Sequence, residues 1–201
     1  MRPSKFLKCS DFPCSDVNKE AYMIPGVEIE PEKIRAIMVS ESPPEDAGDY
    51  FYANNSPSYL RTTVQAFNDA GAKVASMKDV LERGVYVTTA IKCAKTAYSI
   101  QPKTTENCCS RILEKEIDLF PRIKTVLLMG DTAIRAMNYI AKKNTGKRLV
   151  PSGSTYKIRK NKYYKQFKVF PSYLQTGKSY FIEKSKRIMI AEDIKAVLEQ
   201  P

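Results

Sequence analysis

The chain has 201 residues, of which 43% are hydrophobic and 27% are charged, proportions typical of a globular protein that builds its core without disulfide bonds. It contains no histidine, which excludes Ser-His-Asp and Cys-His catalytic groups and every metal site with a histidine ligand. Lys and Arg number 33 against 22 Asp and Glu, and the resulting net charge of +11 predicts an anionic partner, most often nucleic acid.

The first half of the chain contains two predicted strands, because residues 34–39 and 85–91 are apolar and rich in β-branched side chains. Between them, apolar residues at helical spacing predict a helix over 58–71. A short helix over 76–84 begins with a pattern that resembles a capping box and stops at a glycine.

The second half continues the same alternation. A helix is predicted to begin at Thr104 or Thr105, and the almost wholly apolar residues 124–129 predict a strand buried on both faces. Another helix follows this strand directly. Residues 156–170 predict a basic hairpin whose second arm supplies the last strand, and residues 185–198 predict a closing helix.

This alternation predicts an α/β fold with a central parallel sheet. The sequence has no repeat, low-complexity tract or linker, so a single domain over residues 1–201 is expected. Ligands of such folds bind at the carboxyl ends of the strands. The candidate binding loops are therefore 40–56, 88–95, 130–132 and 172–180.

The sequence also indicates an intracellular, cytoplasmic protein with no membrane partner. No segment approaches the roughly 18 apolar residues that span a bilayer. The basic residues 1–8 are not followed by the apolar stretch of a signal peptide. In a reducing compartment, the five cysteines are expected to be free thiols or metal ligands rather than disulfides.

Four segments in or beside the candidate loops resemble motifs of the uracil-DNA glycosylase superfamily. They begin at Met38 (MVSESPPED), Tyr86 (YVTTAIKC), Val126 (VLLMGDTA) and Val169 (VFPSY). In order, they are similar to the GE(A/G)PG motif, the TNxxKC segment of the iron–sulfur, thermophile-type family 4 branch, the ixLGxxA turn and the HPS region. The resemblance implies a three-layer α/β/α fold around a mostly parallel four-stranded sheet. It also implies a monomeric DNA N-glycosylase that flips out and hydrolytically excises a modified or deaminated base.

The resemblance assigns roles to individual residues. It implies that Glu41 orients the water and stabilises the sugar cation, and that Phe51 stacks on the flipped base. Ser42, Thr89 and Ser172 are the other candidate base-binding residues. Thr89 stands where the family has an asparagine, and a hydroxyl cannot make the paired amide contacts that select uracil. Without the resemblance, a core Phe51 and a solvated Glu41 are the alternatives.

The histidine of the HPS region is missing, so the donor that would stabilise the departing base must be another residue. A preorganised donor of this kind contributes about 3–4 kcal/mol. Gln175 is the candidate catalytic donor, with Ser172 or Thr176 as alternatives. The missing histidine also supports a second hypothesis, a catalytically silent nucleic-acid-binding member of the superfamily.

Cysteine spacing predicts a metal centre. By resemblance, Cys9, Cys14, Cys93 and Cys109 hold a structural [4Fe–4S] cluster that ties about the first 20 residues to the fold, with Cys108 as the alternative fourth ligand. The C-x4-C pair departs from the CxxC of the iron–sulfur glycosylases. A four-cysteine zinc site, buried free thiols, and an unrelated α/β protein with a structural zinc remain alternatives.

A basic segment predicts the nucleic-acid contact. Residues 157–168 carry six basic side chains among aromatic ones, which favours phosphate contacts over a merely solvated edge strand. The candidate DNA-binding residues are Lys157, Arg159, Lys160, Lys162, Lys178 and Tyr180. Tyr180 or Leu174 is the candidate wedge into the base stack. The expected partner is DNA, single- or double-stranded, in a nucleoid-associated protein, and RNA stays open.

Overall fold

The computed structural model describes residues 1–54, 57–159, 162–165, 167–177 and 179–199. Its centre is a five-stranded sheet with the order β3-β2-β5-β7-β6. The strands are β2 (Ala36–Ser40), β3 (Val85–Thr89), β5 (Thr125–Met129), β6 (Lys162–Tyr164) and β7 (Phe167–Ser172). The first three and β7 run parallel, which confirms the predicted α/β fold, and β6 adds an antiparallel strand at one edge.

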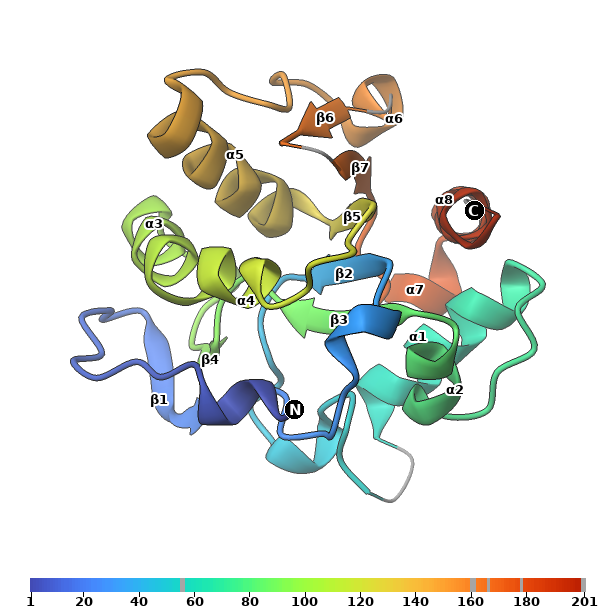
Figure 1. The fold of residues 1–201 in the computed structure, drawn as a ribbon, viewed down its shortest axis with the longest axis horizontal. Coiled ribbons are helices and arrows are strands. Elements are labelled where there is room, and N and C mark those ends of the chain that lie inside the picture. The colour runs from blue at the N-terminus through green and yellow to red at the C-terminus, as the bar shows by residue number, and fades with distance from the viewer. Residues whose placement is uncertain (55–56, 160–161, 166, 178, 200–201) are drawn as a thin grey trace.

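Helices cover both faces of this sheet, as Figure 1 shows. One face carries α1 (Ser58–Asp69), α2 (Met77–Glu82) and α8 (Lys184–Leu198). The other carries α3 (Pro102–Cys108), α4 (Glu114–Asp118) and α5 (Asp131–Thr145). Short helices α6 (Thr155–Ile158) and α7 (Ser179–Ile182) precede β6 and α8, and single 3-10 turns occupy Pro3–Lys5, Pro31–Lys33 and Ala47–Asp49.

The alternation of side chains along each strand builds the two halves of the core. On β2, Ile37 packs in the cluster that contains Met137 of α5. Its neighbour Met38 packs in the other cluster, with Phe67 of α1 and Ile190 of α8. All residues of β2, β3 and β5 are buried, as expected for parallel strands covered on both faces.

A second, two-stranded sheet holds the N-terminal segment against the loop that follows β3. Strands β1 (Val17–Tyr22) and β4 (Cys93–Lys95) pair antiparallel, with Val17 opposite Lys95 and Tyr22 opposite Cys93. The register shifts between Asn18 and Tyr22, which marks a bulge. This sheet fixes the position of β4 relative to the chain that carries the first two cysteines.

Strand β3 lies at the edge of the central sheet, and a tyrosine hydroxyl bonds its backbone there. The Tyr52 hydroxyl donates to the carbonyl of Val87 at 2.9 Å and accepts from its N–H at 3.1 Å. Burial in this position raises the pKa of Tyr52 well above its usual value, so the hydroxyl stays protonated and can serve as donor and acceptor.

The predicted start of α2 is confirmed in detail. Ser76 is the N-cap, and its hydroxyl accepts from the N–H of Asp79 at 3.2 Å. The Asp79 carboxylate in turn accepts from the N–H of Ser76 at 2.9 Å, which completes a capping box. These bonds hold the pKa of Asp79 below its usual value.

Two predicted elements differ from the structure. The helix expected to start at Thr104 or Thr105 starts at Pro102, because proline suits the first turn, where an N–H has no partner within the helix. The expected hairpin over 156–170 is shorter, because α6 occupies its beginning and only β6 and β7 pair. Within the described residues, no helix is long and apolar enough to cross a membrane.

Candidate functional site

A cleft of about 940 Å³ opens beside the carboxyl ends of β2, β5 and β7. All four predicted binding loops contribute to it. Its lining includes Glu41, Tyr59, Lys95, Thr132, Tyr173 and Thr176. The cleft is therefore where an α/β fold of this topology binds ligands.

Glu41 is held at the wall of this cleft by two side chains. One carboxylate oxygen, Oε2, accepts from Lys95 Nζ at 2.8 Å, and Oε1 accepts from Thr132 Oγ1 at 3.0 Å. The Glu41 carbonyl accepts from the N–H of Ile91 at 3.0 Å, which fixes the backbone after β2. With 19% of its side chain exposed, the carboxylate is oriented and still accessible from the cleft.

The other cations of the cleft have different partners. Lys186 pairs with Glu183 and lies 5.5 Å from the centre of the Tyr173 ring. Arg187 binds both carboxylate oxygens of Asp69, and this guanidinium holds the pKa of Asp69 below its usual value. Among the described side chains of the cleft, Lys95 is thus the cation that contacts Glu41.

Phe51, the predicted base-stacking residue, is 1% exposed and packs in the core. Its ring centre lies 5.2 Å from those of Tyr50 and Tyr59. Tyr59, which the sequence analysis did not single out, lines the cleft, and burial raises its pKa to about 12. The structure therefore puts Phe51 behind an accessible aromatic ring, and a direct stacking role for Phe51 stays a prediction.

The candidate base-binding residues Ser42, Thr89 and Ser172 are almost wholly buried. None of them is among the described residues that line the cleft. The Ser172 hydroxyl donates to the Asp193 carboxylate, and the Thr89 carbonyl accepts from Lys92 Nζ. Their role in reading a base stays a prediction.

Gln175, the predicted catalytic donor, is fully buried and does not line the cleft, although its chain neighbours Leu174 and Thr176 do. Its Oε1 accepts from Ser40 Oγ at 3.5 Å, and its Nε2 donates to Met38 Sδ at 3.3 Å. Because the amide has no exposed surface, it cannot touch a base as the loops now stand. Of the alternatives to Gln175, Thr176 does line the cleft.

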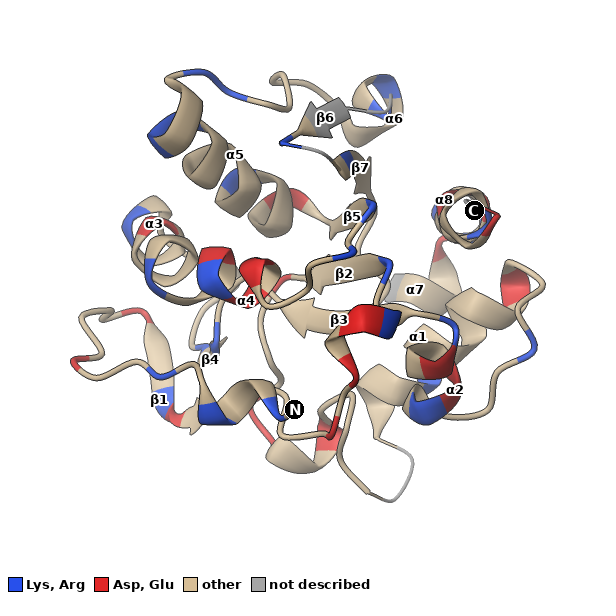
Figure 2. Ribbon diagram, in the orientation of Figure 1, with Lys and Arg blue, Asp and Glu red and all other residues tan. Residues whose placement is uncertain are grey.

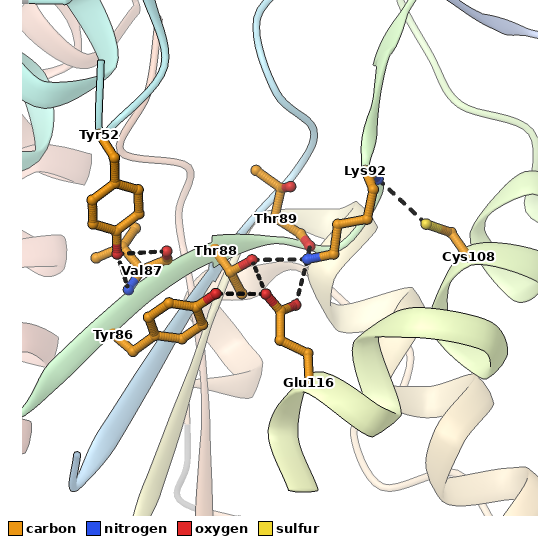
Figure 3. Close-up of polar contacts among 8 residues, drawn as sticks. All are labelled: Tyr52, Tyr86, Val87, Thr88, Thr89, Lys92, Cys108 and Glu116. Atoms are coloured by element: carbon orange, nitrogen blue, oxygen red, sulfur yellow. Dashed lines mark hydrogen bonds and ion pairs between the residues drawn. The ribbon is translucent and has the colours of Figure 1, made fainter. Parts of the chain in front are cut away.

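A buried polar network connects the end of β3 with α4 and Cys108, as Figure 3 shows. Lys92 Nζ pairs with the Glu116 carboxylate and donates to Thr88 Oγ1 at 2.8 Å. Glu116 Oε1 also accepts from Tyr86 at 2.7 Å and from Thr88 at 2.9 Å. The N–H of Lys92 donates to Cys108 Sγ at 3.3 Å. One lysine thus joins β3, α4 and a cysteine.

Four cysteines line one small apolar pocket, and the fourth is Cys108. The other three are Cys9, Cys14 and Cys93. Cys109 instead packs in the core against α5 and the sheet, with 1% of its surface exposed. Of the two adjacent candidates, Cys108, the alternative in the sequence analysis, is therefore the one that lines the pocket, and a π-helical turn over Cys109–Leu113 begins directly after it. Which of the two is a ligand stays a prediction.

The four thiols surround the pocket without converging on one point. Within the described ranges, no three cysteine or acidic side chains are close enough to hold a single metal ion. Burial and the nearby Cys108 raise the pKa of the Cys93 thiol to about 12, and burial raises that of Cys108 to about 11. Metal binding would therefore have to displace protons from these thiols.

The predicted DNA-binding residues that the structure describes lie on different elements. Lys157 is exposed on α6, whereas Arg159 is 16% exposed and bonded to Asp193 at 2.8 Å. Burial raises the pKa of Asp193 above its usual value. Lys162 lies on β6 and its side chain is outside the described residues, as are Lys160 and Lys178 altogether. Lys and Arg are spread over most helices and loops (Figure 2).

Tyr180, the candidate wedge, is buried rather than protruding. It is 3% exposed, its hydroxyl donates to Asp69 at 3.0 Å, and the Arg187 guanidinium lies 5.5 Å from its ring centre. Its successors Phe181 and Ile182 are 53% and 75% exposed. Leu174, the alternative wedge, is partly buried and lines the cleft.

Sequence reasoning missed Lys95 and Thr132, the two residues that hold Glu41. Both lay inside predicted binding loops, so a polar side chain in such a loop was an available signal. Their pairing with Glu41 was not, because it joins residues 54 and 91 positions apart in the chain.

Comparison with known proteins gives a family. No curated protein sequence is significantly similar to this chain. Among solved structures, the wild-type UNG crystal structure from Nitratifractor salsuginis is similar, with a TM-score of 0.42 and 12% sequence identity over 88% of this chain and 81% of that one. That likeness is too weak to carry an argument.

The family model of the uracil DNA glycosylase superfamily matches residues 27–190. This range covers most of the chain and includes Glu41, Lys95 and Thr132, and it begins after Cys9 and Cys14. The motifs recognised in the sequence lie within it. The chain therefore belongs to the uracil DNA glycosylase superfamily.

Proposed function

We propose that this protein is a DNA N-glycosylase that hydrolyses the bond between a modified or deaminated base and its sugar. The observation that carries the proposal is the oriented carboxylate of Glu41 at the wall of the cleft. Membership of the superfamily supports this reaction class. The partner in this proposal is DNA, which the net charge of +11 favours.

The chemistry follows from the charges that the reaction creates. Breaking the glycosidic bond leaves positive charge on the sugar and negative charge on the base. The Glu41 carboxylate can stabilise the sugar cation and orient the attacking water, while Thr132 keeps it in position. The products are a free base and an abasic site. Excision requires the nucleotide to leave the duplex and enter the cleft.

A single-turnover assay tests this function. Oligonucleotides that carry uracil, hypoxanthine, xanthine or a bulkier modified base are incubated with excess protein, and abasic product is measured. Glu41→Gln should lower the rate about 10²–10³-fold. Glu45→Gln makes the same chemical change at an exposed position of the same loop and should leave the rate unchanged. Equal rates for both variants would remove Glu41 from the reaction.

A second candidate function is a catalytically silent nucleic-acid-binding member of the superfamily. The chain has no histidine, and the buried Gln175 does not reach the cleft, which favours this candidate. Salt-sensitive binding of the same oligonucleotides with no abasic product across the panel would support it. Product from any base would exclude it.

We further propose that Cys9, Cys14, Cys93 and Cys108 hold a [4Fe–4S] cluster, which would place the chain in the iron–sulfur branch. Four thiols around one apolar pocket, with the Lys92 N–H donating to Cys108, fit such a group chemically. A cluster binds each cysteine through a different iron atom, whereas one zinc ion needs all four sulfurs at a single centre. When bound, the cluster would tie the N-terminal segment to β4 and α3.

Two neighbouring cysteines provide the test of this proposal. Protein purified without oxygen should contain iron and acid-labile sulfide, and Cys108→Ser should lose both. Cys109→Ser should retain them, because Cys109 faces the core and not the pocket. Zinc in place of iron would support the alternative site, and loss of iron only in Cys109→Ser would reverse the assignment.

A further inference from the structure

We propose that Lys95 is a catalytic residue whose ammonium group stabilises the negative charge of the departing base. The inference rests on the proposed glycosylase function. Because the chain has no histidine, another residue must donate to the departing base. The observation behind the inference is that Lys95 lines the cleft and contacts the Glu41 carboxylate directly.

The Lys95 side chain combines a fixed position with an available donor. Its ammonium group has three N–H donors. One is given to Glu41 Oε2 at 2.8 Å and one to the Tyr98 carbonyl at 3.2 Å. Within the described residues, no further hydrogen bond uses the third, and the ammonium also lies 5.9 Å from the centre of the exposed Tyr98 ring. About a third of the side chain, 34%, is exposed, so a bound base can reach the ammonium without breaking the ion pair.

The ion pair matches the charge separation of the reaction. As the bond breaks, the sugar gains positive charge beside a carboxylate, and the base gains negative charge beside an ammonium. Both groups are already oriented before the reaction begins, which is the condition under which fixed charges stabilise a transition state. The Glu41 carboxylate and the Lys95 ammonium would thus act on opposite ends of the same bond.

The other polar groups of the cleft are less suited to this role. Lys186 is paired with Glu183, Arg187 makes two bonds to Asp69, and an Arg135 nitrogen donates to the carbonyl of Ile100. None of these cations is bonded to Glu41 within the described residues. Thr176 can donate one neutral hydrogen bond, which stabilises an anion less than a charge-assisted one does.

The backbone around Lys95 is held from two sides. Lys95 is the last residue of β4 and lies opposite Val17 of β1 in the two-stranded sheet. Two residues earlier, Cys93 lines the four-cysteine pocket. The N-terminal segment therefore positions the cation of the cleft, which gives the cysteine-rich region a direct connection to the reaction.

The test compares leaving groups. Single-turnover rates are measured on the base that the wild type excises and on the same base with an electron-withdrawing substituent, for example uracil and 5-fluorouracil. Lys95→Gln should lower the rate on the parent base about 10²–10³-fold. It should lower the rate on the substituted base much less, because that anion is a weaker base and needs less stabilisation. Lys95→Arg should restore most of the rate.

Two controls separate a catalytic role from a positioning one. Lys103→Gln removes the same charge from an exposed pair with Glu106 and should change neither rate. In a Glu41→Gln background, Lys95→Gln should still lower the rate further, since the two groups act on different charges.

Four results would overturn the inference. Equal losses on the two bases, or no further loss in the double variant, would mean that Lys95 acts only by holding Glu41. An unchanged rate for Lys95→Gln would exclude any role. A wild type that excises no base at all would instead overturn the proposed function, and this inference with it.

Discussion

Lys92 and Glu116 form an ion pair in which neither side chain has any exposed surface. Removing two charges from water is costly, and such pairs persist only where hydrogen bonds satisfy the remaining donors and acceptors. Tyr86 and Thr88 provide those bonds on the carboxylate, and the Thr89 carbonyl accepts from the ammonium. The pair therefore fixes the loop after β3, which leads to both the cleft and the cysteine pocket.

Replacing Lys92 by Met should destabilise the protein strongly. The variant keeps the volume of the side chain but leaves the Glu116 carboxylate buried without a cation, which costs about 3–5 kcal/mol. Urea unfolding at neutral pH measures the change. Lys103→Met is the matched control, because its pair with Glu106 is exposed and contributes less than about 1 kcal/mol. Similar losses in both variants would contradict this account.

Single site residues were predictable only where a motif named them. Glu41 was found because its motif places an acid at the end of a strand, and the structure puts it in the cleft. Tyr180 was expected to contact DNA and Gln175 to contact the departing base, and both are buried, because a sequence motif does not state which side of a loop faces solvent. Cys108 lines the cysteine pocket and Cys109 packs in the core, and two adjacent cysteines carry no sequence signal that says which one faces the pocket.

At the scale of elements, α1 and α8 are joined on their solvent side by one charged contact. Asp69, the last residue of α1, accepts from Arg187 at 2.6 and 2.9 Å and from the Tyr180 hydroxyl at 3.0 Å. Tyr180 belongs to α7, so the carboxylate connects three helices around the rim of the cleft.

This contact should make stability depend on pH in the acid range. Arg187 lowers the pKa of Asp69 in the folded protein, so the contact contributes fully above the unfolded-state value of about 3.8. The contribution is lost as the pH falls through that value towards the lower folded pKa. Asp69→Asn should therefore cost roughly 1–2 kcal/mol at pH 7 and much less at pH 3.

Urea unfolding of both proteins at the two pH values measures this effect. Glu82→Gln serves as the control, because its contact with Lys78 is exposed and 3.8 Å long. A loss for Asp69→Asn that is the same at pH 7 and pH 3 would show that the carboxylate charge is not what stabilises the contact.

The elements themselves were largely predictable, because their apolar residues repeat at the period of a helix or a strand. Strands β2, β3 and β5 and helices α1, α2, α5 and α8 match their predicted segments closely. The prediction of a strand in the segment before β6 was wrong, because charged and aromatic residues alternate there as they do in a strand. Thr155 and Ile158, three positions apart, are both buried, and that spacing places them on one face of α6.

At the scale of the whole molecule, the net charge of +11 bears on the proposed DNA partner. The predicted basic hairpin does not carry this charge alone, since Arg159 is engaged with α8 and basic residues are spread over the surface. The cleft contributes Lys95, Lys186 and Arg187, so phosphate contacts are expected around its rim.

The logarithm of the binding constant for a non-specific duplex should fall linearly with the logarithm of the salt concentration. The slope is set by the number of phosphates that the protein neutralises. Lys186→Gln should reduce this slope by about 0.9, the value for one lost contact. Lys78→Gln makes the same substitution on α2, away from the cleft, and should leave it unchanged. Fluorescence anisotropy at several salt concentrations measures both. Equal slopes for wild type and Lys186→Gln would place the bound DNA elsewhere.

The hydroxyl of Tyr52 affects whether copies of this protein can aggregate through their sheet edges. Strand β3 ends the parallel sheet, and an uncovered strand edge is a template on which a second molecule can add its own strand and begin an aggregate. At the middle of β3, the donor and the acceptor of Val87 are both already bonded to Tyr52. A strand of a second molecule therefore cannot form backbone hydrogen bonds with Val87, and the Tyr52 side chain opposes extension of the sheet at this edge.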